Sequence, residues 1–271
     1  MGTAMGYQWW TLSNGWYLLA YDQWLGQKQV LHGLVTRRLQ PTLPRWQWPE
    51  APDFSLKRSE DFQRRLGLLM ELLDIADWGA AYAAQVHRTT VLWNPPPVHA
   101  TDLPEADGLM TDRTALLLGV TVADCVPIWI YDQALPAVGI VHAGWRGTVQ
   151  GILEAALDIL EAQGSDLSRV EIVLGPSIQR CCYAVGLDVL EAVYQAYPDW
   201  APYVLEHRTQ RWFLDLVGLN ILQARRRGLR RTQIHPLRLC TYCNGSWFFS
   251  YRRGDTGRLL AFIGRLSASS G

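Results

Sequence analysis

The sequence has little lysine, no excess of either charge and no long apolar run. Lysine occurs only at positions 28 and 57, which argues against a Schiff-base lysine enzyme and leaves any phosphate or carboxylate site to arginine. The 25 basic and 25 acidic side chains balance, whereas dedicated nucleic-acid-binding proteins normally carry a basic excess. No apolar run reaches the roughly 18 residues that span a membrane. We therefore expect neither a nucleic-acid partner nor a membrane partner.

Cysteine is also scarce, and its count is odd. Five cysteines in 271 residues, with no basic stretch followed by an apolar one near residue 1, predict neither a disulfide framework nor a signal peptide. The corresponding expectation is a cytoplasmic protein with reduced thiols. Several catalytic motifs are missing too, namely G-x-S-x-G, the P-loop, G-x-G-x-x-G and H-E-x-x-H. The chemistry must therefore come from side chains outside these motifs.

Apolar residues, in contrast, are plentiful, and their spacing predicts an α+β protein with one or two sheets. Hydrophobic residues make up 49% of the chain, enough for one large domain or two small ones. A helix is expected where Phe62, Leu66, Leu69 and Leu73 share one face, with Ser59 as its cap.

The other expected elements follow from apolar runs and turn residues. Strands are expected within 7–36 and at 116–123, 126–131, 137–141, 170–174, 247–251 and 259–263, with the last two paired as a hairpin. Helices are expected at about 145–163, 187–197 and 215–227, and a loop at 40–53.

Three candidate metal ligands lie at predicted strand ends. His87, Cys125 and His142 offer two imidazoles and a thiolate, which suit a borderline-soft divalent ion. Three protein ligands would leave one tetrahedral position open, as in catalytic zinc sites. The spacings fit no short metal motif, so a core histidine and a buried cysteine explain the residues equally well at this point. Arg146, at the predicted start of a helix, is a candidate anion-binding residue whose simpler interpretation is a surface ion pair.

A competing metal site is a structural zinc knuckle made by Cys240, Cys243 and His235. A single C-x2-C pair predicts such a site only weakly. We expect instead that these cysteines, together with Cys181 and Cys182, are buried thiols.

Several of these segments share a wider pattern with a known family. They resemble, in family order over residues 30–265, the YfiH-type family, which is also called the laccase-domain or multicopper polyphenol oxidase family. The segments that carry the resemblance are Gln85-Val86-His87, Ala106-Asp107-Gly108, residues 121–127 around Cys125, residues 141–147 around His142, Gly175-Pro176-Ser177-Ile178, Cys240-Thr241-Tyr242 and Ser250-Tyr251-Arg252-Arg253.

The resemblance implies one domain over residues 1–271, in which mixed β-sheets are flanked by helices in a cysteine-hydrolase-like YfiH fold. It also implies a zinc site formed by His87, Cys125 and His142. The implied reactions are phosphorolysis of adenosine, inosine, guanosine and S-methyl-5'-thioadenosine, and deamination of adenosine. Purine nucleosides and phosphate would then be the partners of a monomer or homodimer.

Roles for further residues depend on the same resemblance. Arg37 and Arg146 are expected to position phosphate, while Asp124 is expected either to shuttle a proton or to orient a ligand. Cys125 is expected to be a metal-bound thiolate and not a nucleophile.

The chain departs from the family pattern at three places. The family's Thr-Arg is present as Thr36-Arg37, but Leu39-Gln40-Pro41-Thr42 stands where the family has Gly-Gly-x-Ser. Phe62-Gln63 replaces Asn-Arg in the first helix, and Ala184 replaces a glutamate. The metal ligands are intact, so the departures bear on the anion site and the substrate preference that the resemblance implies.

Three other functions are compatible with the sequence. Two histidines and one cysteine also form the core of a blue-copper site, so a copper-dependent phenol oxidase is one alternative, and copper could bind these ligands in vitro. A zinc-stabilised binding protein without catalysis is the second. Hydrolysis or transamidation through Cys125 and His142 is the third, by analogy of fold alone.

Overall fold

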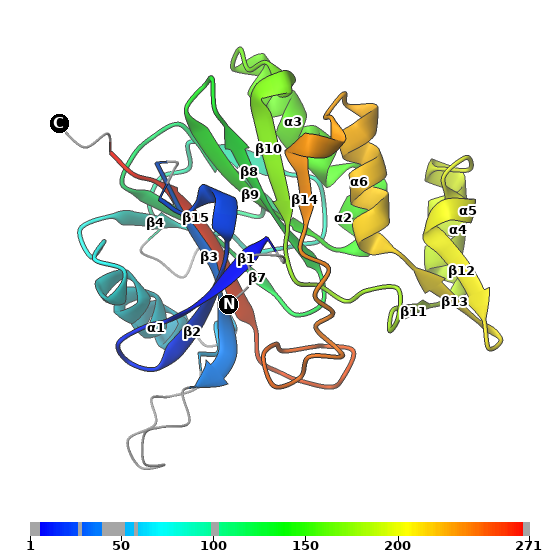
Figure 1. Ribbon diagram of the computed structural model, residues 1–271, viewed down its shortest axis with the longest axis horizontal. Helices are drawn as coiled ribbons and strands as arrows, with labels where there is room; N and C mark the ends of the chain where they lie inside the picture. The colour runs from blue at the N-terminus through cyan, green and yellow to red at the C-terminus, as the bar shows by residue number, and fades with distance from the viewer. Residues whose placement is uncertain (1–5, 27–28, 40–51, 57–58, 99–102, 268–271) are drawn as a thin grey trace.

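Two six-stranded sheets and one three-stranded sheet form the β-structure of the computed structural model, which describes residues 6–26, 29–39, 52–56, 59–98 and 103–267 (Figure 1). The first sheet has the order β1 (Tyr7–Thr11), β2 (Trp16–Tyr21), β3 (Val30–Leu39), β15 (Leu259–Arg265), β7 (Leu116–Val122) and β4 (Gly79–Ala81). The second has the order β14 (Ile234–Pro236), β10 (Val170–Leu174), β8 (Val126–Asp132), β9 (Ala137–Ala143), β6 (Gly108–Thr111) and β5 (Val91–Trp93).

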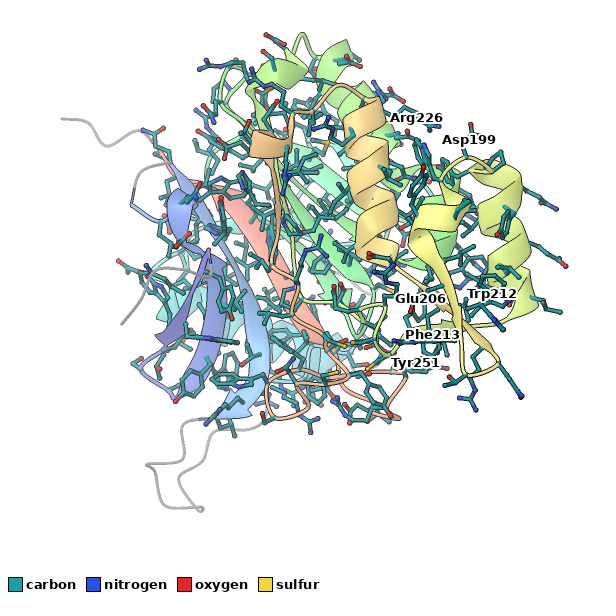
Figure 2. The ribbon with its side chains drawn as sticks, turned by 45° about the vertical axis from the view of Figure 1, so that its right-hand side comes forward. Asp199, Glu206, Trp212, Phe213, Arg226 and Tyr251 are labelled. Carbon is teal, nitrogen blue, oxygen red and sulfur yellow. The ribbon has the colours of Figure 1, made fainter. Side chains whose placement is uncertain are left out.

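The helices of the described part lie outside the pair of large sheets (Figure 1). They are α1 (Ser59–Leu72), α2 (Trp145–Gln150), α3 (Ile152–Ala162), α4 (Leu187–Ala196), α5 (Ala201–Val204) and α6 (Leu216–Arg226), with short 3-10 turns at Asp22–Trp24, Leu167–Arg169 and Arg231–Gln233. None of these helices is both long and apolar enough to cross a membrane. The third sheet, β11 (Ala184–Val185), β13 (Arg211–Leu214) and β12 (Leu205–Arg208), lies beside α4 and α5, away from the first sheet (Figure 2).

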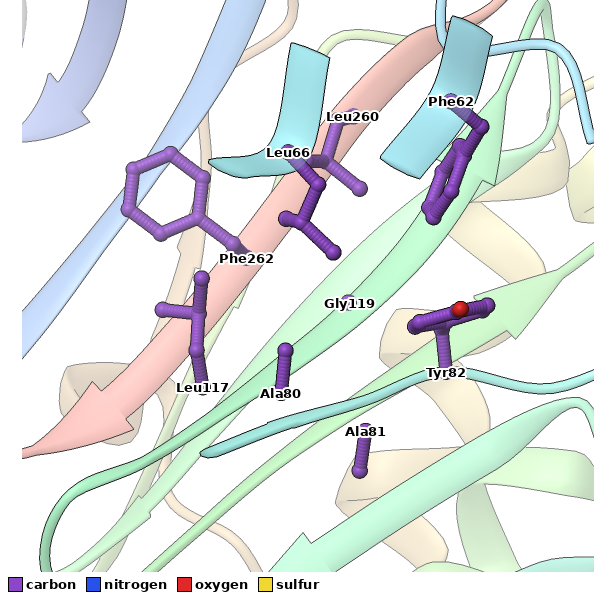
Figure 3. A pocket seen from close by; sticks show the side chains of 9 residues that line it. All are labelled: Phe62, Leu66, Ala80, Ala81, Tyr82, Leu117, Gly119, Leu260 and Phe262. Atoms are coloured by element: carbon purple, nitrogen blue, oxygen red, sulfur yellow. The ribbon is translucent and has the colours of Figure 1, made fainter. Parts of the chain in front are cut away.

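Three clusters of buried side chains hold the layers together. One lies between the two large sheets, where the indole of Trp129 donates a hydrogen bond to the carbonyl of Phe262 over 2.9 Å. A second packs α1 on the first sheet, and Figure 3 shows Phe62 and Leu66 of α1 beside Leu260 of β15. The void at that contact is only about 10 Å³, no larger than one water molecule. The third cluster packs α2, α3 and α6 on the second sheet.

The strand alternation of the second sheet decides where the site residues point. Successive side chains of a strand face opposite sides, so His142 shares the face of Val138 and Ile140, which pack toward the first sheet. The register pairs Pro127 of β8 with His142 of β9. Cys125 precedes Pro127 by two residues and therefore lies on the same face, next to His142.

Most predicted elements are present, and the exceptions have physical causes. The buried strands and α1, α4 and α6 lie where the apolar spacing predicts them, and the side chain of Asp215 caps α6 at Gly218. The single helix expected at 145–163 is wrong, because Gly151 adopts a φ of +89° and divides it into α2 and α3. Ser59 is the first residue of α1 and does not precede it.

The predicted hairpin of 247–251 and 259–263 is also wrong. The apolar run at Trp247–Phe249 fills the core from a series of turns and forms no strand. β15 instead pairs with β3 and β7, two strands that are far from β15 along the chain. Most of the predicted loop at 40–53 lies outside the described residues.

Candidate active site and metal centre

The structure brings His87, Cys125 and His142 together. Their ligand atoms all lie within 4.8 Å of one another, although the residues come from three separate segments. His142 is near the end of β9, Cys125 directly precedes β8, and His87 lies on the loop after β4. The two imidazole rings meet edge to face with centroids 4.8 Å apart.

A buried carboxylate, Asp107, orients two of these three residues. Its Oδ1 lies 2.8 Å from Nδ1 of His142. The two carboxylate oxygens together also accept hydrogen bonds of 2.9–3.1 Å from the backbone N–H groups of Val86, His87 and Arg88. Because a carboxylate can only accept, Nδ1 of His142 carries a proton and Nε2 faces the cluster. This is the carboxylate–histidine arrangement typical of metal sites. Sequence reasoning noticed Asp107 in a motif but assigned it no role; the signal was an aspartate directly before a buried strand.

The loop that carries His87 is held in a strained conformation. His87 has a φ of +61°, in the left-handed region that non-glycine residues rarely adopt. Besides the three bonds to Asp107, the side-chain amide of Gln85 pairs with the backbone of Thr121 on β7, donating over 2.8 Å and accepting over 2.7 Å. Such over-determined strain is common at functional sites.

The space around the cluster fits a metal ion. A Cβ added at Gly144 would lie 3.0 Å from the His87 ring and 3.1 Å from the Cys125 sulfur, so only glycine leaves these ligands in place. A Cβ at Gly147 would lie 3.0 Å from the carbonyl of Arg88. With one sulfur and two imidazoles converging on one point, the residues present fit a zinc or copper ion.

The electrostatics of the cluster favour a thiolate. Burial opposes ionisation of Cys125, but the charges and hydrogen bonds of His142 and His87 outweigh it and lower the pKa of the thiol to about 6. Burial likewise opposes protonation of His142, yet Cys125 and Asp107 raise its pKa to about 9. A cation is therefore favoured between the thiolate and the imidazole, and a metal ion can take the place of the imidazole proton.

The cluster opens into a cavity of about 580 Å³. Its lining includes the three ligands, the rings of Trp145, Tyr183 and Tyr251, and the guanidinium-bearing residues Arg146, Arg252 and Arg258. Arg37 does not line this cavity; its guanidinium lies 3.2 Å from the carboxylate of Asp255. Sequence reasoning thus placed one of its two phosphate candidates here and missed Arg252 and Arg258.

Asp124, next to Cys125, is buried and its carboxylate is fully engaged. One oxygen accepts from the hydroxyl of Thr241 over 2.5 Å, and the other accepts from the Ser250 hydroxyl and from the backbone N–H of Arg252 over 3.1 and 2.7 Å. Asp124 also has a positive φ, of 94°. It therefore ties the loop of residues 241–252 to the segment that carries Cys125.

The alternative zinc knuckle of Cys240, Cys243 and His235 is wrong, because His235 does not lie with the two cysteines. Its Nε2 is 3.8 Å from the carboxylate of Glu171. The two cysteines meet Cys181 and Cys182 instead. The expectation of buried thiols holds for Cys240 but is wrong for Cys181 and Cys243, which are exposed.

Comparison with known proteins identifies the family. Residues 57–266 match the family model described as "Multi-copper polyphenol oxidoreductase laccase". The chain belongs to this family. One solved family relative, titled Bacillus licheniformis hypothetical protein YfiH, superposes with a TM-score of 0.81 at 28% identity, covering 96% of this chain and 99% of the other. The resemblance noted in the sequence and the YfiH-like fold are confirmed.

Curated members of the family carry enzyme names. "Purine nucleoside phosphorylase YlmD" of Geobacillus stearothermophilus is 38% identical over 170 residues, which cover 61% of this chain and 62% of that protein. "Adenosine deaminase RL5", from an unknown prokaryotic organism, is 32% identical over 198 residues, which cover 70% of this chain and 75% of that protein. The chain thus spans about three fifths of the length of the first of these relatives.

Proposed function

We propose that this chain is a zinc-dependent purine nucleoside enzyme that phosphorolyses adenosine, inosine, guanosine and S-methyl-5'-thioadenosine and also deaminates adenosine. The observation that carries the proposal is the convergence of His87, Cys125 and His142 with arginine residues on one cavity of about 580 Å³. Cavities of this size accommodate small-molecule ligands. The names of the two relatives, a phosphorylase and a deaminase, support the same chemistry.

His87, Cys125 and His142 would hold the zinc ion and leave a fourth position open to the cavity. When bound there, zinc supplies a Lewis acid that polarises an oxygen atom of a ligand or of water. Asp107 keeps the proton on Nδ1 of His142, so that Nε2 is the ligating atom. Gly144 leaves room for the ligands.

In phosphorolysis, a phosphate oxygen attacks C1′ of the ribose as the bond to the base breaks. Arg146 and Arg252 would hold the phosphate, because guanidinium groups bind phosphate oxygens with paired, charge-assisted hydrogen bonds. Arg258 lies on the same lining and adds to the positive charge. Arg37 would act indirectly, through its ion pair with Asp255.

The purine base would stack on the aromatic part of the lining, formed by Trp145, Tyr183 and Tyr251. Of these rings, Tyr183 is buried and Tyr251 is exposed at 70%. We propose that Asp124 acts by positioning, because both of its oxygens already accept hydrogen bonds that fix the backbone of Arg252.

Phenol oxidation, which the family description suggests, is less well supported. A laccase needs a histidine-rich trinuclear cluster in addition to its first copper site. In the described residues, the other candidate metal group consists of cysteines alone. His32 accepts a hydrogen bond from Tyr21 in the core, and His207 packs on Trp212.

The deciding experiment incubates metal-analysed protein with adenosine, with and without phosphate, and separates the products by chromatography. Adenine and ribose 1-phosphate formed only with phosphate would establish phosphorolysis, and inosine formed without phosphate would establish deamination. The variant Cys125→Ala is run in parallel, and loss of product in it places the chemistry at this cluster. An absence of turnover with a full zinc site would overturn the proposal in favour of a binding role.

A further inference from the structure

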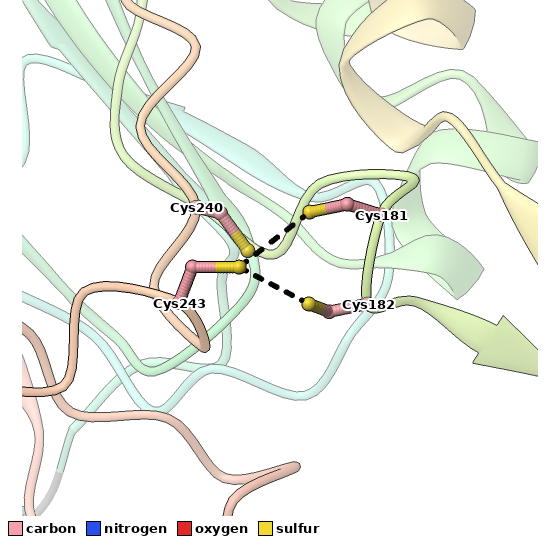
Figure 4. Close-up of side chains that lie close together, drawn as sticks. All are labelled: Cys181, Cys182, Cys240 and Cys243. Atoms are coloured by element: carbon pink, nitrogen blue, oxygen red, sulfur yellow. Dashed lines mark hydrogen bonds between the residues drawn. The ribbon is translucent and has the colours of Figure 1, made fainter.

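A second group of soft ligands lies outside the catalytic cavity. The sulfur atoms of Cys181, Cys182, Cys240 and Cys243 all lie within 4.8 Å of one another (Figure 4). The Cys243 sulfur is 3.7 Å from that of Cys181 and 3.3 Å from that of Cys182. Four thiolates at the usual zinc–sulfur distance of about 2.3 Å from a tetrahedral ion would lie about 3.8 Å apart, so the spacing fits one ion.

The four cysteines come from two loops that are already joined by backbone contacts. Ser177 and Cys240 form an isolated parallel bridge, in which the N–H of Ser177 donates to Leu239 and the N–H of Thr241 donates to Ser177, each over 3.1 Å. The same two loops carry Tyr183 and Arg252, which line the catalytic cavity. A cross-link between them would therefore support one wall of that cavity.

The local geometry favours a metal ion over a disulfide. All four thiols are free, and their sulfur atoms converge on one point, whereas disulfides would join them only in pairs. Cys240 and Cys243 form a C-x2-C turn, the spacing of half a zinc ribbon. Backbone N–H groups of Gln179 and Cys243 are directed at the Cys240 sulfur. N–H groups directed at a ligand atom are typical of metal sites.

We propose that Cys181, Cys182, Cys240 and Cys243 bind a second, structural zinc ion that joins the two loops. Four thiolates fill the tetrahedral coordination of zinc and leave no open position, so this site is structural, in contrast to the one at Cys125. The thiol protons pass to solvent as the ion binds. The site is partly exposed, since Cys181 and Cys243 reach the surface, and the ion can therefore enter from solution.

The test uses the full-length variant Cys125→Ala, in which the catalytic group has lost its sulfur. Metal analysis and zinc X-ray absorption of this variant are expected to show one zinc ion per chain, surrounded by four sulfur atoms at about 2.3 Å. Adding Cys243→Ser is expected to abolish that zinc, whereas adding Tyr242→Phe, an exposed neighbour, is expected to leave it in place.

Three results would overturn the proposal. They are the absence of zinc from metal-replete Cys125→Ala, zinc bound there with nitrogen neighbours, and a disulfide between Cys243 and Cys181 or Cys182 in protein purified under reducing conditions. If the double variant does not fold, the absorption spectrum of Cys125→Ala decides alone. These readouts do not depend on nucleoside turnover, so they separate this proposal from the catalytic one.

Discussion

At the scale of single residues, Asp107 shows how a side chain that is not itself a candidate ligand sets the positions of the candidate ligands. It is fully buried, accepts hydrogen bonds from three consecutive backbone N–H groups and holds Nδ1 of His142. One carboxylate therefore places His87 through its backbone and His142 through its ring. Asp107 thus couples the positions of the two histidines.

Replacing this carboxylate is expected to weaken zinc binding. Asp107→Asn keeps the shape of the side chain but presents an amide, so it lowers zinc affinity by roughly 10- to 100-fold, as is usual for partners of metal-ligating histidines. Competition with a fluorescent zinc chelator measures the change, with the exposed Asp199→Asn as the control (Figure 2). Equal affinity in the two variants would contradict the role of Asp107.

The cavity arginines allow a second test at this scale. If the two arginines bind phosphate as proposed, Arg146→Ala and Arg252→Ala each remove charge-assisted hydrogen bonds worth about 1.5–3 kcal/mol. The KM for phosphate should therefore rise by roughly 10- to 100-fold. Arg37→Ala is expected to change this KM less, because Arg37 pairs with Asp255 outside the cavity lining. Initial rates at varied phosphate decide, and equal effects of Arg37 and Arg146 would contradict this division.

At the scale of elements, the site depends on a close approach between the loop of residues 85–88 and the junction of β9 with α2. Gly144 and Gly147 lie at that junction, and a Cβ on either would lie about 3 Å from the loop. The α2 helix has only six residues, so its dipole contributes little to an anion site. The junction thus serves chiefly to let the two segments touch.

A methyl group at the first of these positions should disturb the metal cluster. Gly144→Ala places its Cβ against the His87 ring and the Cys125 sulfur. We expect overpacking to cost about 1–3 kcal/mol of zinc binding or of folding free energy. Zinc content after dialysis and urea unfolding measure the two. Gly67→Ala is the control, because a Cβ there meets no atom within 4 Å, and an identical response of both variants would refute the explanation.

A buried histidine in the β2–β3 pair predicts that the stability of the fold depends on pH. His32 of β3 is buried, its Nε2 accepts the N–H of Tyr21, and desolvation lowers its pKa from 6.5 to about 4. The unfolded chain therefore takes up a proton between these values that the folded chain does not, and stability falls as the pH decreases through this range. Between about pH 7 and about pH 4.5 this one residue should cost about 2.5 kcal/mol.

The variant His32→Gln separates this effect from other acid effects. Glutamine can still accept the N–H of Tyr21 but does not titrate. Urea unfolding at both pH values should show a smaller decrease in the free energy of unfolding for the variant than for the wild type. Equal decreases would exclude His32 as the titrating group.

At the scale of the whole molecule, the two large sheets are joined by a core in which Trp129 is central. Its ring is 1% exposed, packs among residues of both sheets and donates to the carbonyl of Phe262 on β15. Cys125 of the proposed metal cluster directly precedes β8, four residues from Trp129. The stability of the sheet contact and the geometry of the site are therefore connected.

Truncation of this ring should destabilise the fold as a whole. Trp129→Ala is expected to lower the free energy of unfolding by about 3–5 kcal/mol, through lost burial and the cavity left behind. The control Trp10→Ala, at a tryptophan exposed by 49%, should change it by less than about 0.5 kcal/mol. Urea denaturation followed by circular dichroism measures both. A similar loss in each would show that the sheet contact is not centred on Trp129.

Local patterns in the sequence were sufficient for strands β1–β3, β7–β10 and β15 and for the main helices, but they missed the short strands β4, β5, β6 and β11–β14. The type of metal chemistry stays a prediction. Apolar runs specify buried strands such as β7, because burial on both faces leaves little room for polar residues. The ligand types of His87, Cys125 and His142 determine which ions can bind. The Gly151 break and the turns at 247–251 were not predictable, since burial of Trp247–Phe249 depends on partners far along the chain.

The convergence of the ligands was decided by tertiary structure alone. His87 and Cys125 are 38 positions apart in the sequence, and only the register of β8 with β9 and the bonds of Asp107 bring them to one point. The same holds for the choice of Arg252 over Arg37 in the cavity and for the meeting of Cys181 and Cys182 with Cys240 and Cys243. The sequence by itself determined which atoms are available for chemistry, whereas long-range strand pairing decided which of them meet, because such contacts have no local signature.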